Sequence, residues 1–171
     1  SGAAVSVNTV GAGGSLSVSS GTFSSDVSDY CTANLHTPLT GSVYPVTALE
    51  SNAATVSVTS GSETSYYTSL KAALSDAADG ATVTLLGDIT LTTQTTISSG
   101  KSIILELNGH TLSSNVTYTI YNSGTLTIQD SSADGSGKVE NTNANGYAVY
   151  SNKSLTITGG TFTSTAKTYG T

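Results

Sequence analysis

The chain of 171 residues lacks arginine, methionine and tryptophan, and it contains one cysteine and two prolines. Its basic charge comes from five lysines, and the more numerous acids leave a net charge of −6. A phosphate backbone needs clustered basic side chains, so we expect no nucleic-acid partner. Cys31 stands alone and cannot build a disulfide framework; we expect it to be a small buried residue, with a reactive thiol or a bridge between chains as the alternatives. No apolar run approaches the roughly 18 residues of a membrane span, so we expect no membrane insertion of this segment.

Serine and threonine, by contrast, are abundant, and a chain so rich in them can be a disordered stalk. The pattern favours strands instead, because short β-branched and apolar runs alternate with threonine and are bounded by Gly, Asn, Asp or Ser clusters. The sequence therefore predicts an ordered, mostly β protein. The four clearest runs are 81–86, 103–107, 125–128 and 154–157.

An internal repeat indicates how these strands are arranged. Residues 118–128 match residues 147–157 as Tyr-x-(Ile/Val)-Tyr-x4-Leu-Thr-Ile. A repeat of this size predicts a parallel β-solenoid with coils of about 29 residues, each of which buries its apolar row against the next.

A longer repeat indicates tandem modules. Residues 15–25 match residues 154–164, and most positions are identical or exchange Ser for Thr or Val for Ile. We expect the chain to be part of a longer array, with neighbouring modules of the same protein beside it. The predicted divisions are the terminal coils of a preceding module (1–28), a connector and closing segment (29–62), and a helix-capped module that is incomplete at its C-terminal side (63–171).

One segment departs from the β pattern. Between Ser65 and Gly80, apolar residues fall at helical spacing, with Thr64 or Ser65 as the N-cap and Gly80 as the residue that ends the helix. A solenoid end exposes apolar side chains and strand edges, so we expect this helix to cover the first coil.

Two stretches carry a family resemblance. Residues 69–89 together with 103–112 resemble the cap helix and first coils of right-handed, pectate-lyase-like parallel β-helix proteins. Residues 21–31, Gly-Thr-Phe-Ser-Ser-Asp-Val-Ser-Asp-Tyr-Cys, are similar to the phrase that closes β-helix modules in large repeat-containing surface adhesins of Gram-positive gut bacteria. The resemblance implies an all-β, right-handed parallel β-helix with a short α-helical cap. It also implies an extracellular location on the bacterial surface, attached to the cell wall through other regions.

An enzyme is the main competing interpretation, because the resembled fold also includes polysaccharide lyases and glycoside hydrolases. Lyases of that kind commonly use an Arg or Lys base with Ca²⁺, and arginine is absent here. Hydrolases need two carboxylates about 5–10 Å apart. In the register of the shorter repeat Asp130 aligns with Gly159, and Glu106 has no acidic partner, so we expect no catalytic residue and no cofactor.

The remaining polar motifs predict turns more readily than sites. Asp130 and Asp134 are the candidate Ca²⁺ ligands, but their spacing fits neither an EF-hand nor a calcium β-roll, and an Asp-Gly turn is preferred. We expect Asp26 and Asp29 to cap backbone groups in a turn. The two histidines carry little signal: His110 follows an Asn-Gly turn, and His36 lies close to a proline.

The most informative residues are aromatic, because nine of the eleven aromatics are tyrosines. Tyr118, Tyr121, Tyr147 and Tyr150 recur in the repeat, and their odd spacing predicts one member of each pair inside the coil and one outside. An outer row could bind sugar rings or a protein; the alternative is that both rows are structural stacks. We expect a non-catalytic adhesin repeat that binds host glycan, such as mucin, or a host protein such as an immunoglobulin. A lyase or hydrolase and a spacer stalk are the alternatives.

Overall fold

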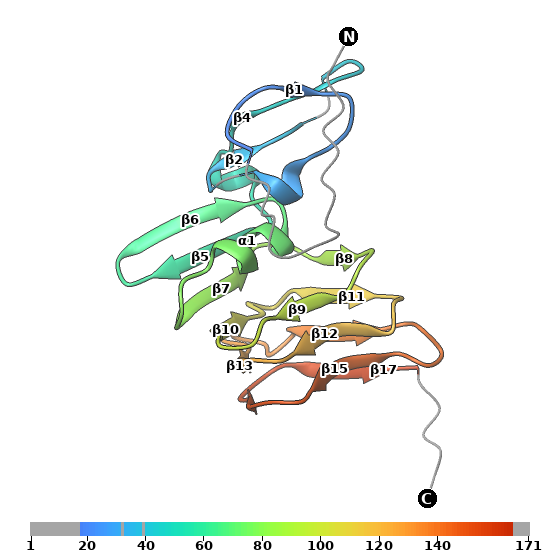
Figure 1. Ribbon diagram of the computed structural model, residues 1–171. Helices are drawn as coiled ribbons and strands as arrows, with labels where there is room; N and C mark the ends of the chain where they lie inside the picture. Colours follow the sequence, from blue (N-terminus) through green and yellow to red (C-terminus); the bar gives the residue numbers. More distant parts are fainter. Residues whose placement is uncertain (1–17, 32, 39, 166–171) are drawn as a thin grey trace, which may run out of the picture.

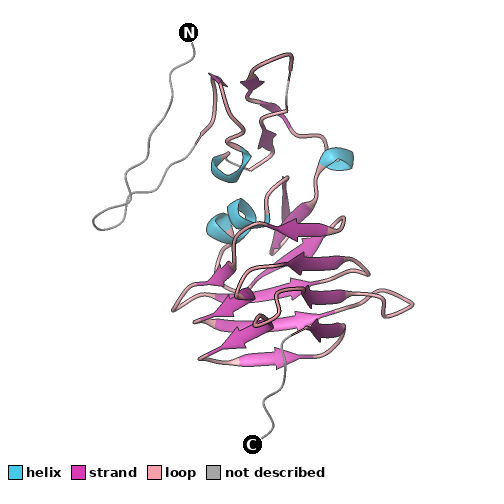
Figure 2. Ribbon diagram, turned by 90° about the vertical axis from the view of Figure 1, so that its right-hand side faces the viewer, coloured by secondary structure: helices cyan, strands magenta, loops and turns pink. Residues whose placement is uncertain are grey.

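The computed structural model describes residues 18–31, 33–38 and 40–165, and most of them form a parallel β-solenoid of about four turns. Strands far outnumber helices among the described residues, so the predicted mostly β class is confirmed. Figure 1 shows the coils stacked below a smaller N-terminal region, and Figure 2 shows the same stack from the side with the helices above it. None of the helices in the described part is long and apolar enough to cross a membrane.

Three rows of parallel strands run along the stack, each within its own sheet: the first two take one strand from each of four coils, and the third takes one strand from each of three coils. The first sheet contains β7 (Ala81–Leu85), β10 (Ser102–Glu106), β13 (Thr125–Gln129) and β16 (Leu155–Ile157). The second contains β8 (Ile89–Leu91), β11 (Thr111–Ser114), β14 (Lys138–Asn141) and β17 (Thr161–Ser164). The third contains β9 (Thr95–Ile97), β12 (Tyr118–Asn122) and β15 (Tyr147–Ser151). We number the coils one to four from β7, β10, β13 and β16.

The strand register shows that coil length varies. Tyr118 pairs with Tyr147, and Leu126 with Leu155, as the repeat predicts. Ser102 pairs with Thr125, which follows it after a shorter stretch of chain, so the coil length indicated by the repeat is wrong for this coil. The strands keep their alignment because their inward side chains must stack, whereas the solvent-facing turns absorb insertions.

The solenoid core consists of aliphatic columns that run through successive coils. Val83, Leu105 and Ile128 follow one another in register, and each is at most 2% exposed. Full burial of such a side chain contributes about 1.5–3 kcal/mol. These columns therefore account for much of the cohesion between coils.

A β-hairpin closes the first coil at its upper end. It consists of β5 (Val56–Ser60) and β6 (Glu63–Tyr67), and β5 pairs antiparallel with β7. The expected boundary between residues 62 and 63 falls inside this hairpin. The three-part division of the chain stays a prediction.

Helix α1 (Leu70–Asp76) packs beside the hairpin and buries Leu70, Ala73 and Leu74 in the core, so the expected cap helix is present. It is shorter than predicted: Ser69, not Thr64 or Ser65, is the N-cap, and its hydroxyl accepts a hydrogen bond from the N–H of Ala72. Residues 63–67 form a strand instead, because their Thr and Tyr side chains suit pairing with β5.

Lys101 and Tyr67 hold the helix in place. The Lys101 ammonium donates hydrogen bonds to the carbonyls of Leu74, Ser75 and Ala77, each at 2.8 Å. Lys101 therefore caps the C-terminal carbonyls of the helix, at the end for which the sequence predicts Gly80 as the terminating residue. The Tyr67 hydroxyl donates to Asp76 at 3.3 Å. Burial, followed by the nearby Asp76 carboxylate, raises the pKa of Tyr67 to about 12.

The region before the hairpin is built from very short elements. They are β1 (Thr22–Phe23), η1 (Ser28–Tyr30, a 3₁₀-helix), β2 (Leu35–His36), β3 (Tyr44–Pro45), β4 (Thr47–Ala48) and η2 (Ser51–Ala53, a 3₁₀-helix). β1 pairs with β3 and β2 with β4, both antiparallel. Most of the expected terminal coils in residues 1–28 lies outside the described residues.

Candidate functional site

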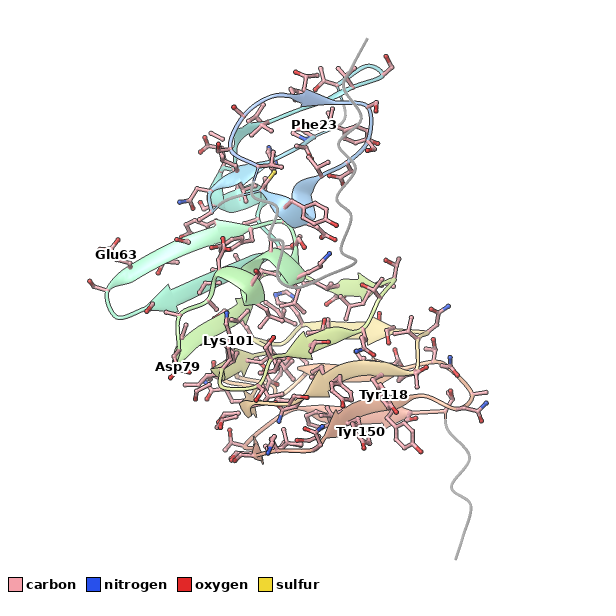
Figure 3. All side chains as sticks on the ribbon, in the orientation of Figure 1. Phe23, Glu63, Asp79, Lys101, Tyr118 and Tyr150 are labelled. Carbon is pink, nitrogen blue, oxygen red and sulfur yellow. The ribbon has the colours of Figure 1, made fainter. Side chains whose placement is uncertain are left out.

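Four tyrosine rings meet on the third sheet and form what we term the tyrosine cluster: Tyr118 and Tyr121 on β12, and Tyr147 and Tyr150 on β15. Ring centroids lie 4.9 Å apart for Tyr118 and Tyr150, and 5.4 Å apart for Tyr121 and Tyr150. The second pair is stacked, with only 14° between the ring planes. Figure 3 shows Tyr118 and Tyr150 side by side on the lower coils.

All four side chains lie outside the coil, so the expected inner row is wrong. The alternation of β12 is interrupted, because Thr119 and Ile120 are consecutive and both 0% exposed. The Thr119 hydroxyl hydrogen-bonds to Ser114 Oγ at 2.7 Å and donates to the Glu140 carbonyl at 2.9 Å, so Thr119 is held inward at a corner of the coil. That break places Tyr118 and Tyr121, three residues apart, on the same face.

The lower pair of rings is the more accessible one. Tyr147 is 52% exposed and Tyr150 is 40% exposed. The reason is that β15 is the edge strand of the third sheet: within the described residues, β12 pairs with it on one side and no strand pairs with it on the other. Large exposed apolar groups gathered in one place are typical of binding surfaces.

Asn152 adds a polar group to the cluster by donating from Nδ2 to the Tyr121 hydroxyl at 3.1 Å. This residue was not among the predicted binding residues. The register of the repeat could have found it, because Asn152 lies two positions beyond Tyr150, the partner of Tyr121. The cluster thus combines ring faces, hydroxyls and an amide, a set of groups suited to ligands that have both C–H faces and hydroxyls.

The two carboxylates considered for catalysis organise turns. Within the first sheet Glu106 pairs with Thr84 and Gln129, and its carboxylate accepts hydrogen bonds from the N–H groups of Asn108 and Ser131. Burial acts to raise the pKa of Glu106, but these hydrogen bonds together with the one from the Gln129 amide outweigh it, and the pKa is lowered.

Asp130 is held in the same way. Burial acts to raise its pKa, but its carboxylate accepts from the N–H groups of Gly109, Ser132 and Gly137, and these bonds outweigh burial and lower the pKa. A side chain at the position of Gly159 would meet the Asp130 backbone, in agreement with the predicted alignment of the two residues.

Asp134, the other candidate Ca²⁺ ligand, accepts from the N–H of Ser136 at 3.2 Å within the loop. Hydrogen bonds from Ser136 lower its pKa. In the described part of the chain, no group of three or more His, Cys, Asp or Glu side chains is arranged to hold a metal ion. The described contacts of Asp130 and Asp134 are therefore those of turn residues.

Two further residues singled out from the sequence, Cys31 and His110, have clear surroundings. Cys31 is 4% exposed and unpaired with another cysteine, its backbone pairs with Val18, and burial raises the pKa of its thiol, so the expected burial is confirmed. His110 follows the turn at Asn108 and Gly109, both with positive φ, and its Nδ1 lies 3.5 Å from Asp88 Oδ1.

Comparison with known proteins adds no further support, since no family model, curated protein or solved structure matches this chain. The tyrosine cluster is consequently the site on which a function is best argued.

Proposed function

We propose that this chain is a non-catalytic repeat of an extracellular bacterial surface adhesin, which binds host glycan or a host protein through the coil faces and loops. The observation that supports it most is the tyrosine cluster: four uncharged aromatic side chains gathered on one outer face, with the two rings of β15 left open. The proposal requires no catalytic residue and no cofactor. Attachment to the cell wall would come from other regions of the protein.

The geometry favours a glycan as the partner over a flat protein surface. Tyr121 and Tyr150 stack on each other, so the ring surface left for a ligand is that of the edge strand, chiefly Tyr147 and Tyr150. A patch of two rings with an adjacent amide matches one or two sugar units, whereas stable protein interfaces bury about 800 Å² on each partner. Mucin glycans are the first candidates, and an immunoglobulin is the first protein candidate.

The test is biosensor binding of the chain to mucin, pectins, matrix glycans and immunoglobulins. We expect saturable binding to one glycan class, and a Kd about tenfold weaker or more for Tyr147→Ala with Tyr150→Ala, because aromatic anchors dominate such interfaces. Tyr66→Ala, on β6 and away from the cluster, is the matched control and should retain binding.

Other outcomes would contradict the proposal. Flat traces with folded protein would leave a spacer stalk as the better account. Release of unsaturated or reducing sugar ends from a polysaccharide would indicate a lyase or hydrolase. Binding that survives the double substitution would remove the tyrosine cluster from the site.

A further inference from the structure

A second feature lies apart from the tyrosine cluster, where the N-terminal region meets the top of the solenoid. A cleft of about 630 Å³ opens between residues 26, 29–30, 36–38 and 44 on one side and residues 68–71 and 89–93 on the other. Sites for small molecules commonly have volumes of roughly 300–1,000 Å³. The cleft is therefore large enough for a sugar unit.

Aromatic and hydroxyl groups line the cleft. Tyr30, which is 37% exposed, and the partly buried Tyr44 contribute rings, and Ser69 and Thr90 are among the hydroxyl-bearing residues of the lining. Sugars present an apolar C–H face together with hydroxyls that donate and accept hydrogen bonds. A lining of Tyr rings and small hydroxyls matches both properties.

One hydroxyl of this lining is unsatisfied. Thr68 Oγ1 is buried and has no hydrogen-bond partner in the described part of the chain. Buried polar atoms of this kind are uncommon in folded proteins, because the group has lost water without gaining a partner. A ligand hydroxyl that enters the cleft can supply the missing partner after a small side-chain adjustment.

The charges of the cleft select against acidic ligands. Asp26 accepts from the Thr37 hydroxyl at 2.7 Å, and Asp29 accepts from Ser69. Lys71 is the one lysine of the lining; its Nζ lies 3.7 Å from Asp29 Oδ2 and 4.7 Å from the centre of the Tyr30 ring. The lining thus contains two carboxylates and one ammonium. These described contacts join distant segments, and the local turn caps expected for Asp26 and Asp29 stay a prediction.

We propose that this cleft is a second binding site, which takes a neutral sugar unit. The ring of the sugar lies against Tyr30 or Tyr44, and its hydroxyls bond to Thr68 and to the carboxylates. The site rests on the cleft alone, and it does not require the tyrosine cluster to bind glycan.

The two histidines of the chain provide a direct readout. His36 lines the cleft and His110 does not, so the imidazole Cε1–H signals in an NMR spectrum report on the cleft and on an internal control. The probes are the methyl glycosides of galactose, mannose, N-acetylglucosamine and N-acetylgalactosamine, each titrated to millimolar concentration. We expect at least one of them to shift the His36 signal in a saturable way and to leave His110 unchanged.

Charge controls sharpen the result. Methyl glucuronide and sialic acid should leave His36 unchanged, because the carboxylates repel them. An absent shift with every neutral glycoside, or equal shifts with the acidic sugars, would overturn the proposal. A shift produced by glucosamine alone would also overturn it, since the cleft would then be a cation site.

Two variants locate the ligand. Thr68→Val keeps the shape and removes the hydroxyl, and Tyr44→Ala removes a ring; each should weaken the saturable shift of His36 about tenfold or more. An unchanged His110 signal verifies that each variant is folded. Tyr147→Ala is the matched control, and it should retain the shift; its loss there would place the ligand at the tyrosine cluster instead.

Discussion

Equivalent residues of neighbouring coils show how little of a residue's role is set by its own identity. Ile128 in the third coil and Ile157 in the fourth pair with each other in register and belong to the same repeated Leu-Thr-Ile sequence. Ile128 is 0% exposed, whereas Ile157 is 48% exposed. The difference is the presence of a covering coil, because β13 lies between β10 and β16 while β16 has a described partner on one side only.

The two ends of the solenoid extend this comparison. At the upper end, Val58 of the hairpin covers Val83, and helix α1 packs beside it. At the lower end, the tyrosines of β15 and Ile157 remain open to solvent. The closed end contributes stability, and the open end offers the surface on which the proposed function rests.

The largest expected effect contrasts the two isoleucines. Ile128→Ala leaves a cavity between coils and should lower the free energy of unfolding by about 3 kcal/mol. Ile157→Ala removes a half-exposed side chain and should cost below about 1.5 kcal/mol. Urea unfolding followed by circular dichroism measures both. Equal losses would mean that the lower end of the stack is covered in solution.

A polar pair gives the next effect. Asn122 is fully buried; its Nδ2 donates to Ser151 Oγ and to the Ser154 carbonyl, and its Oδ1 accepts from the N–H of Gly124. Asn122→Ala leaves these partner groups without a hydrogen bond and should lower the free energy of unfolding by about 2 kcal/mol. Ser151→Ala, at the paired position one coil later, should cost about half of that or less. Urea unfolding measures both variants. A larger loss of stability for Ser151→Ala than for Asn122→Ala would contradict this prediction.

The stabilisation by Glu106, the turn carboxylate of the second coil, should depend on pH. The pKa of Glu106 is lowered in the folded state, so its contribution is present above the unfolded pKa and is lost as pH falls through the folded value. Glu106→Gln should therefore destabilise the protein near pH 7, and its difference from the parent should shrink as the pH falls below the usual Glu pKa of about 4.3. Free energies of unfolding measured across this range test the trend. Glu63→Gln, at the exposed tip of the hairpin in Figure 3, is the control with no expected change.

The smallest effect concerns two lysines at equivalent turns. Strand register aligns Lys101 with Gly124, and Gly124 with Lys153 in the coil after that. Lys101→Met removes the ammonium from three helix carbonyls and should cost about 1 kcal/mol. Lys153→Met alters an exposed side chain and should change the stability by less than about 0.5 kcal/mol. Thermal unfolding of both variants measures these losses. A larger loss of stability for Lys153→Met than for Lys101→Met would contradict the role of Lys101 as a helix cap.

The local pattern predicted the principal strands, and the internal repeat predicted the solenoid. Alternating Thr and aliphatic residues, bounded by turn residues, predicted β7, β10, β13 and β16, and the repeat predicted the pairing of Tyr118 with Tyr147. Such features can be read from a sequence because side-chain alternation and stacking register depend on a few neighbouring residues.

Contacts between distant segments decided the rest. The interrupted alternation at Thr119 depends on hydrogen bonds to Ser114 and to the Glu140 carbonyl, and it places Tyr118 and Tyr121 on one outer face instead of on two opposite faces. The cleft likewise depends on Asp29 meeting Ser69, forty residues later in the chain. The sequence by itself determined which side chains are available. The tertiary structure decided which of them lie together and which are covered, because burial is a property of the neighbouring coil and not of the residue.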